Sequence, residues 1–191
     1  MRVAAILLFL VLSTGQGFTQ GATFDLTVKA DPTKASKSPW DGVPGLARSR
    51  VNINEPPDIA VCIVQAEGKP QCLWKPQGRR LLSICQNSVT CTFENVTLPP
   101  PPFGLIFLDI DARLHDLIDI VILSGNATGR GEPDIERALF KAMTTLTPGL
   151  SENAKERGVD KVKVLPLQQC AGSDPCRLTQ SEFQFKRKGQ P

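Results

Sequence analysis

The sequence contains no tyrosine, one histidine, two tryptophans and two methionines among its 191 residues. A Ser-His-Asp hydrolase has little support, because no serine lies in a G-x-S-x-G nucleophile elbow. Paired carboxylates could serve a glycosidase, but the scarcity of aromatic residues leaves little surface for stacking against sugars. No P-loop or dinucleotide glycine fingerprint occurs either. These absences predict that the protein is not an enzyme.

The charges are nearly balanced, with 22 Lys+Arg against 19 Asp+Glu and a formal net charge of +3. A nucleic-acid-binding protein usually carries a dense basic patch, so we expect no nucleic-acid partner. Only one long apolar run occurs, which excludes a polytopic membrane protein. It covers residues 3–12 after Arg2, is too short to span a bilayer, and is followed by small residues. This order is typical of a secretory signal peptide, predicted as residues 1–21, with a core strand or an anchor helix as the alternative.

Six cysteines agree with export to a secreted or periplasmic location, where no transmembrane segment remains after cleavage. An even number of cysteines in an oxidising compartment indicates disulfides. Each neighbouring pair encloses a turn-like segment, at residues 66–69, 86–88 and 171–175, so sequential pairing is the simplest arrangement. The spacings are wider than the C-x₂-C pairs of zinc sites, which disfavours zinc. The predicted bonds are Cys62–Cys72, Cys85–Cys91 and Cys170–Cys176.

Apolar runs and alternating patterns predict a chain of short strands. They fall at residues 23–28, 59–64, 90–98, 105–108, 118–123, 162–167 and 183–185. One helix is predicted over residues 133–145, with Ile135, Leu139 and Ala142 on its apolar face. About seven or eight strands with one short helical insertion indicate an all-β fold, an antiparallel β-sandwich. We expect this domain over residues 22–186 and a flexible basic tail over residues 187–191.

Several aspartates lie where strands are predicted to end. Asp109 and Asp111 directly follow the strand at residues 105–108, and Asp116 comes five residues later. Carboxylates at positions i and i+2 of an extended chain point to the same side, so they can converge on one cation. Oxygen ligands of this kind suit Ca²⁺. Asp41 and Asp58, near the two ends of the loop before the second predicted strand, would supply further ligands; Asp41 is favoured over Asp31 because a turn follows Trp40.

This pattern resembles a C2 domain. The family's third loop reads DxDx₄₋₅D(D/F/L)IG, and residues 109–119 follow it closely, with Asp119 in place of the glycine. The family's first loop ends in (S/P)DPYV, which Pro57-Asp58-Ile59-Ala60-Val61 matches in part. The resemblance implies that the loop end of the sandwich docks on an anionic membrane surface or on a protein partner, with Ca²⁺ as the cofactor.

Apolar and basic residues at this end would support docking on a membrane. They are Leu46, Arg48, Arg50, Arg113 and Leu114. Other readings stay open: an acidic loop whose aspartates serve only local turns, a metal-free structural or adhesive sandwich, and a small inhibitor that uses the loop between Cys170 and Cys176. Sequons at Asn95 and Asn126 predict glycosylation if the source is a eukaryote.

Overall fold

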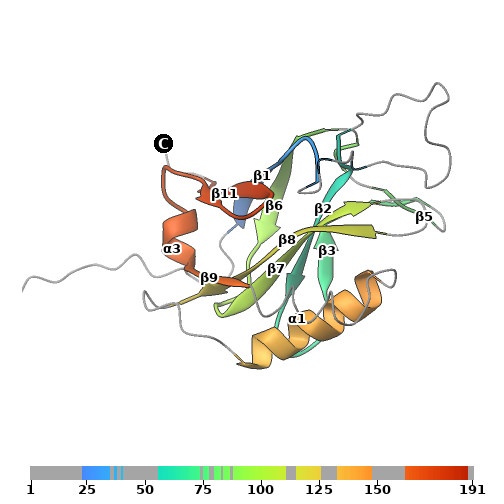
Figure 1. Ribbon diagram of the computed structural model, residues 1–191. Helices are drawn as coiled ribbons and strands as arrows, with labels where there is room; N and C mark the ends of the chain where they lie inside the picture. Colours follow the sequence, from blue (N-terminus) through green and yellow to red (C-terminus); the bar gives the residue numbers. More distant parts are fainter. Residues whose placement is uncertain are drawn as a thin grey trace, which may run out of the picture.

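Two β-sheets packed against one another form the body of the structure, which is a computed structural model (Figure 1). The structure describes residues 23–34, 37, 40, 56–73, 75–77, 80–82, 84–86, 88–110, 115–125, 133–147 and 162–188. The predicted signal peptide lies outside these residues. The predicted all-β sandwich is confirmed.

The first sheet has four strands in the order β10-β11-β1-β6, all antiparallel. Its strands are β1 (Thr23–Ala30), β6 (Thr90–Thr97), β10 (Cys176–Arg177) and β11 (Ser181–Arg187). In β1 the buried residues alternate with partly exposed ones, because one face of this sheet meets the core and the other meets solvent. The strand β11 continues through Arg187, and the Lys188 ammonium donates a hydrogen bond to Asn95 Oδ1 at 2.7 Å, so the first part of the expected tail belongs to the sheet.

The second sheet has five strands in the order β3-β2-β7-β8-β9. Its strands are β2 (Ile59–Val64), β3 (Gln71–Leu73), β7 (Phe103–Ile110), β8 (His115–Ser124) and β9 (Lys163–Pro166). A separate two-stranded ribbon joins β4 (Lys75–Gln77) to β5 (Arg80–Leu82). The described residues thus form eleven strands, more than the seven or eight expected, because short strands such as β3 and β10 carry too little pattern to be read from sequence.

Every residue of β2 and β7 is buried, because both faces of this sheet are covered. Leu105 and Phe107 pack in the cluster between the two sheets, whereas Ile106 and Leu108 pack in a second cluster. The helix α1 (Pro133–Leu146) covers that second cluster along the outer face of the sheet (Figure 1). Its length agrees with the predicted helix within one residue.

The connection through α1 also changes the predicted topology. The strands β8 and β9 on either side of the helix are parallel, with Val121 opposite Lys163, so the second sheet is mixed and not purely antiparallel. Parallel neighbours need a crossover connection, which is usually a helix. The strand expected to reach Leu167 ends at Pro166, where the short helix α3 (Leu167–Cys170) begins.

Three disulfides link the cysteines in the predicted pairs, Cys62–Cys72, Cys85–Cys91 and Cys170–Cys176. The first joins directly opposed residues of β2 and β3 across a hairpin. Gly68 in that hairpin has a φ of 98°, a backbone conformation that favours glycine. Each bond closes a short local loop, which explains why the turn-like segments between neighbouring cysteines identified the partners.

Gly104 of β7 allows the close approach of α1, and its replacement should destabilise the fold. A Cβ at this position would lie 2.6 Å from Leu139 Cδ2, a side chain that is itself fully buried. We expect Gly104→Ala to lower the free energy of unfolding by about 1–3 kcal/mol, measured by urea denaturation. Gly172→Ala is the matched control, because its Cβ would make only ordinary contact, at 3.4 Å from Gln169 O. Equal stability of the two variants would contradict this packing argument.

Candidate functional site

Three of the predicted ligands, Asp58, Asp109 and Asp116, lie at one end of the second sheet. The strand β7 runs to Ile110, past the predicted end at Leu108, so Asp109 lies within the strand and not in a loop after it. Asp109 is directly opposite Asp116 of β8 on one side and Ile59 of β2 on the other. The register of β2, β7 and β8, and not one loop, therefore places Asp109 beside Asp116 and next to Asp58, the residue before β2.

Asp109 has a structural task at this end. Its side chain is 0% exposed, and the Asp58 backbone N–H donates a hydrogen bond to Asp109 Oδ1 at 2.7 Å. The Ile110 N–H in turn donates to the Asp58 carbonyl oxygen at 3.0 Å. These two contacts join the start of β2 to the end of β7 and fix the backbone beside the carboxylate.

Asp116 is partly exposed and meets a cation from the first half of the chain. The Lys34 ammonium forms an ion pair with Asp116 Oδ2 and lies 5.7 Å from the centroid of the Trp40 ring. Trp40 is buried in the core between the sheets, and its indole N–H donates to the Asp31 carbonyl oxygen at 2.8 Å. The segment after β1 thereby contacts the start of β8.

The other predicted residues of this end lie outside the described residues. They are Asp41, Leu46, Arg48, Arg50, Asp111, Arg113 and Leu114. Within the part of the chain that the structure describes, no group of three or more His, Cys, Asp or Glu side chains is arranged to hold a metal ion. The calcium site therefore stays a prediction.

Ile84 adds an apolar side chain near this end. It is 43% exposed and is the only large hydrophobic residue among the described ones with such exposure. Its neighbour Cys85 forms a bridge to Ile59, the first residue of β2. Sequence reasoning did not identify Ile84, since a single apolar residue next to a cysteine gives no signal.

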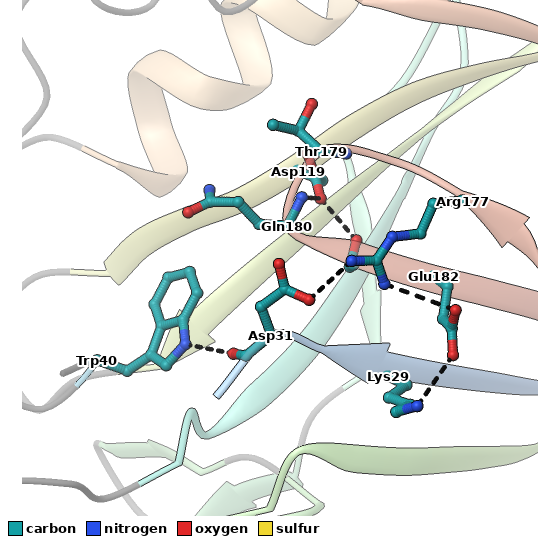
Figure 2. Close-up of polar contacts among 9 residues, drawn as sticks. Lys29, Asp31, Trp40, Asp119, Arg177, Thr179, Gln180 and Glu182 are labelled. Atoms are coloured by element: carbon teal, nitrogen blue, oxygen red, sulfur yellow. Dashed lines mark hydrogen bonds and ion pairs between the residues drawn. The ribbon is translucent and has the colours of Figure 1, made fainter. Parts of the chain in front are cut away.

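Asp119 has a different role from the loop glycine that it replaces in the C2 pattern. The register of β7 and β8 shifts so that Phe107 is opposite Asp119 and Leu108 is opposite Leu117. Asp119 lies on the face of β8 that Val121 and Leu123 present to the core between the sheets, and its carboxylate meets the turn before β11 in the other sheet, as Figure 2 shows. It accepts hydrogen bonds from the Thr179 N–H at 3.3 Å, the Gln180 N–H at 2.7 Å and the Ser181 hydroxyl at 2.7 Å.

A chain of ion pairs lies beside this carboxylate (Figure 2). Arg177 contacts Asp31 at 3.0 Å and Glu182 at 3.5 Å, and Glu182 contacts Lys29 at 3.3 Å. The Arg177 and Lys29 side chains are more than half exposed, so these pairs contribute little stability individually. The buried Asp119 carboxylate is the principal polar link between the two sheets here.

Burial shifts the pKa of two groups in this part of the fold. It raises the pKa of the Asp119 carboxyl, although hydrogen bonds from Ser181, Gln180 and Thr179 act in the opposite direction. It lowers the pKa of the His115 imidazole below its ordinary value of 6.5. A histidine of this kind favours the neutral ring, so its charging on acidification opposes folding.

Of the two predicted glycosylation positions, Asn95 lies within the described residues. Asn95 is exposed on β6, with a φ of 58°, and its N–H donates to Asp25 Oδ1 at 3.1 Å. The register between β1 and β6 is irregular at this point, which is typical of a β-bulge. Asn126 lies outside the described residues.

Comparisons with protein-family models, with curated proteins and with solved structures find no match for this chain. No helix among the described residues is long and apolar enough to cross a membrane. The three disulfides are compatible with an oxidising compartment. The function must therefore be argued from the residues themselves.

Removal of the Asp119 carboxylate should weaken the contact between the sheets. In Asp119→Ala, two backbone N–H groups and the Ser181 hydroxyl lose a buried acceptor. We expect the free energy of unfolding to fall by about 2–3 kcal/mol, measured by urea denaturation at neutral pH. Ser181→Ala removes only one of the three donors and should cost about 1 kcal/mol.

The pH dependence of this effect follows from the raised pKa of Asp119. A carboxyl with a higher pKa in the folded state contributes more stability when protonated, and this extra contribution disappears as the pH rises through the folded-state pKa. The difference between wild type and Asp119→Ala should therefore be larger below pH 3.8, the ordinary value, than at neutral pH. A difference that grows with rising pH would contradict the direction of the shift.

Proposed function

We propose that this protein is an exported binding module that contacts its ligand with the end of the sandwich where β2 begins, β7 ends and β8 begins. The observation that carries the proposal is that Asp109 lies opposite Asp116 at this end and accepts a hydrogen bond from the backbone of Asp58, the residue before β2. The three disulfides and the predicted signal peptide support export.

Calcium is the cofactor that we propose for this end. Carboxylate oxygens are ligands that Ca²⁺ prefers. Asp116 is partly exposed, and its carboxylate forms an ion pair with the Lys34 ammonium. Asp41 and Asp111 would complete the ligand set. Asp109, buried and bonded to the Asp58 backbone, would position the neighbouring oxygens.

An anionic membrane surface is the partner that we propose for the calcium-bound form. Leu46 and Leu114 would enter the interface, while Arg48, Arg50 and Arg113 would meet acidic headgroups. The exposed Ile84 lies beside the start of β2 and supports an apolar contact at this end. Bound Ca²⁺ would cancel the repulsion between the aspartates and the headgroups.

Calcium should raise the stability of the mature protein. Extracellular sites commonly bind with Kd near 10⁻³ M, so 10 mM Ca²⁺ should add about 1.4 kcal/mol to the free energy of unfolding. Asp116→Asn should abolish the increase, whereas Asp134→Asn, an exposed carboxylate on α1, should leave it intact. Differential scanning calorimetry with and without calcium measures the effect.

A melting temperature that does not change with calcium up to 10 mM would contradict the calcium proposal. Magnesium is the second control, because its preference for smaller, octahedral sites predicts a weaker effect. A protein that is indifferent to both ions would leave the metal-free adhesive sandwich as the better description.

Binding to lipid should depend on calcium and on charge. We expect the protein to sediment with phosphatidylserine vesicles in the presence of Ca²⁺. Added salt should release it, because the Debye length is already only about 10 Å at 0.1 M ionic strength and shortens further as salt is added. Leu46→Ser with Leu114→Ser should abolish sedimentation, and phosphatidylcholine vesicles are the control. Calcium binding without vesicle binding would point to a protein or glycan partner.

A further inference from the structure

We infer that the edge of β6 that faces away from β1 is a strand-pairing surface, at which a second copy of this chain adds through its own β6. Among the described residues, β6 has a neighbouring strand on one side only, because it ends the order β10-β11-β1-β6. An edge strand presents backbone N–H and C=O groups that can pair with another chain. Such pairing requires neither calcium nor a membrane.

The register between β1 and β6 identifies the residues whose backbone faces this edge. The Ala30 N–H donates to the opposed Val89 carbonyl oxygen at 2.8 Å, so these two residues form a hydrogen-bonded pair. Hydrogen-bonded and non-hydrogen-bonded pairs alternate along an antiparallel ladder. Counting along β6, Thr90 and Thr92 therefore stand in non-hydrogen-bonded pairs with β1. Their N–H and C=O groups point away from β1, toward the edge.

Two side-chain contacts agree with this direction. The Ser88 hydroxyl donates to the Thr90 carbonyl oxygen at 2.7 Å and accepts the Thr90 N–H at 3.3 Å, so a side chain and not β1 satisfies Thr90. The Thr27 and Thr92 hydroxyl oxygens lie 3.1 Å apart, as expected of a non-hydrogen-bonded pair, in which the side chains are closer. Ser88 thus covers the start of the edge, and the irregular register around Asn95 ends it. The exposed Thr92 is the centre of what remains.

The charges of β6 suit antiparallel pairing with a second β6 about a two-fold axis at Thr92. In this register Thr92 lies opposite its own counterpart, and Glu94 lies opposite Thr90 of the second copy. Glu94 is the only charged residue of β6, and the two Glu94 side chains fall on opposite sides of the axis, so like charges do not face one another. Lys29 of β1 is the neighbour of Thr90 on the same row. Each Glu94 therefore shares a cross-strand row with Lys29 of the other copy.

The pairing should be weak in wild type. A surface of about five residues lies well below the roughly 1,200 Å² that stable complexes bury, so we expect a dimer with Kd on the order of 10⁻⁴ M. Ser88 adds to this weakness, because its hydroxyl holds the Thr90 groups that would otherwise pair with the second copy. Ser88→Ala should release them and lower the dimer Kd by about tenfold.

Sedimentation velocity of the full mature protein, in EDTA and over a series of concentrations, tests the inference. Thr92→Pro removes the N–H that faces the edge and keeps the ladder with β1, because a strand tolerates proline where its N–H points away from the sheet. We expect wild type to dimerise weakly, Ser88→Ala to dimerise more tightly, and Thr92→Pro to remain monomeric.

Thr92→Glu is the second variant, and it keeps the test decisive if the proline variant does not fold. It places two carboxylates opposite one another at the two-fold axis, so it should also remain monomeric. The matched control is Thr144→Glu, which adds the same charge at an exposed position of α1. Its dimer Kd should equal that of wild type.

Amide hydrogen exchange measured by NMR gives a readout at the edge itself. In wild type the protection of the Thr92 N–H should rise with protein concentration, because only the dimer gives it an acceptor. The Phe93 N–H faces β1 in the alternating ladder, so its exchange should be slow at every concentration.

Three outcomes would overturn the inference. A dimer that persists unchanged in Thr92→Pro and Thr92→Glu would show that another face joins the copies. Wild type and Ser88→Ala that both stay monomeric up to about 1 mM, ten times the expected Kd, would show that no second copy adds at this edge. Equal weakening by Thr92→Glu and Thr144→Glu would reduce the effect to one of net charge.

Discussion

The central strands β2, β7 and β8 need a cover on both faces, and most of the architecture follows from this constraint. Leu105 and Phe107 point to the four-stranded sheet, while Ile106 and Leu108 point to α1. An antiparallel sandwich alone would cover one of these faces and expose the other. The helix is therefore the third layer of the structure over these strands, and Gly104 allows it to approach closely.

The burial of these strands also requires hydrogen-bond partners for their carboxylates. Asp109 and Asp119 are buried in strands, where an unsatisfied carboxylate would be costly. Each accepts hydrogen bonds from backbone N–H groups that lie outside the strands. Asp109 accepts from Asp58 before β2, and Asp119 accepts from Thr179 and Gln180 before β11. The carboxylates thus complete the hydrogen bonding of connections that the sheets do not satisfy. Asp119 lies on the same face of β8 as Val121 and Leu123, which pack between the two sheets.

Asp109 and Asp116, at the end of the second sheet where β7 ends and β8 begins, have different tasks although their side chains are chemically identical. Asp109 is fully buried and fixes the start of β2, so it is part of the framework. Asp116 is partly exposed and pairs with Lys34, which comes from the segment after β1. Burial, and not residue type, therefore distinguishes these two carboxylates.

The sequence by itself determined the features that depend on near neighbours in the chain. Alternation in residues 23–28 indicated a half-buried strand, the apolar spacing of Ile135 and Leu139 indicated the helix, and turn-like segments between cysteines indicated the three disulfides. These patterns are local, since side-chain period and short loop closure are decided within a few residues.

The tertiary structure alone decided the features that depend on distant partners. The parallel pairing of β8 with β9, the link from Asp119 to the turn before β11 and the ion pair between Lys34 and Asp116 all join residues far apart in sequence. Lys34 and Asp116 are separated by 82 positions, and no periodicity connects them. Their contact exists because Trp40 is buried between the sheets and brings the segment after β1 to the start of β8.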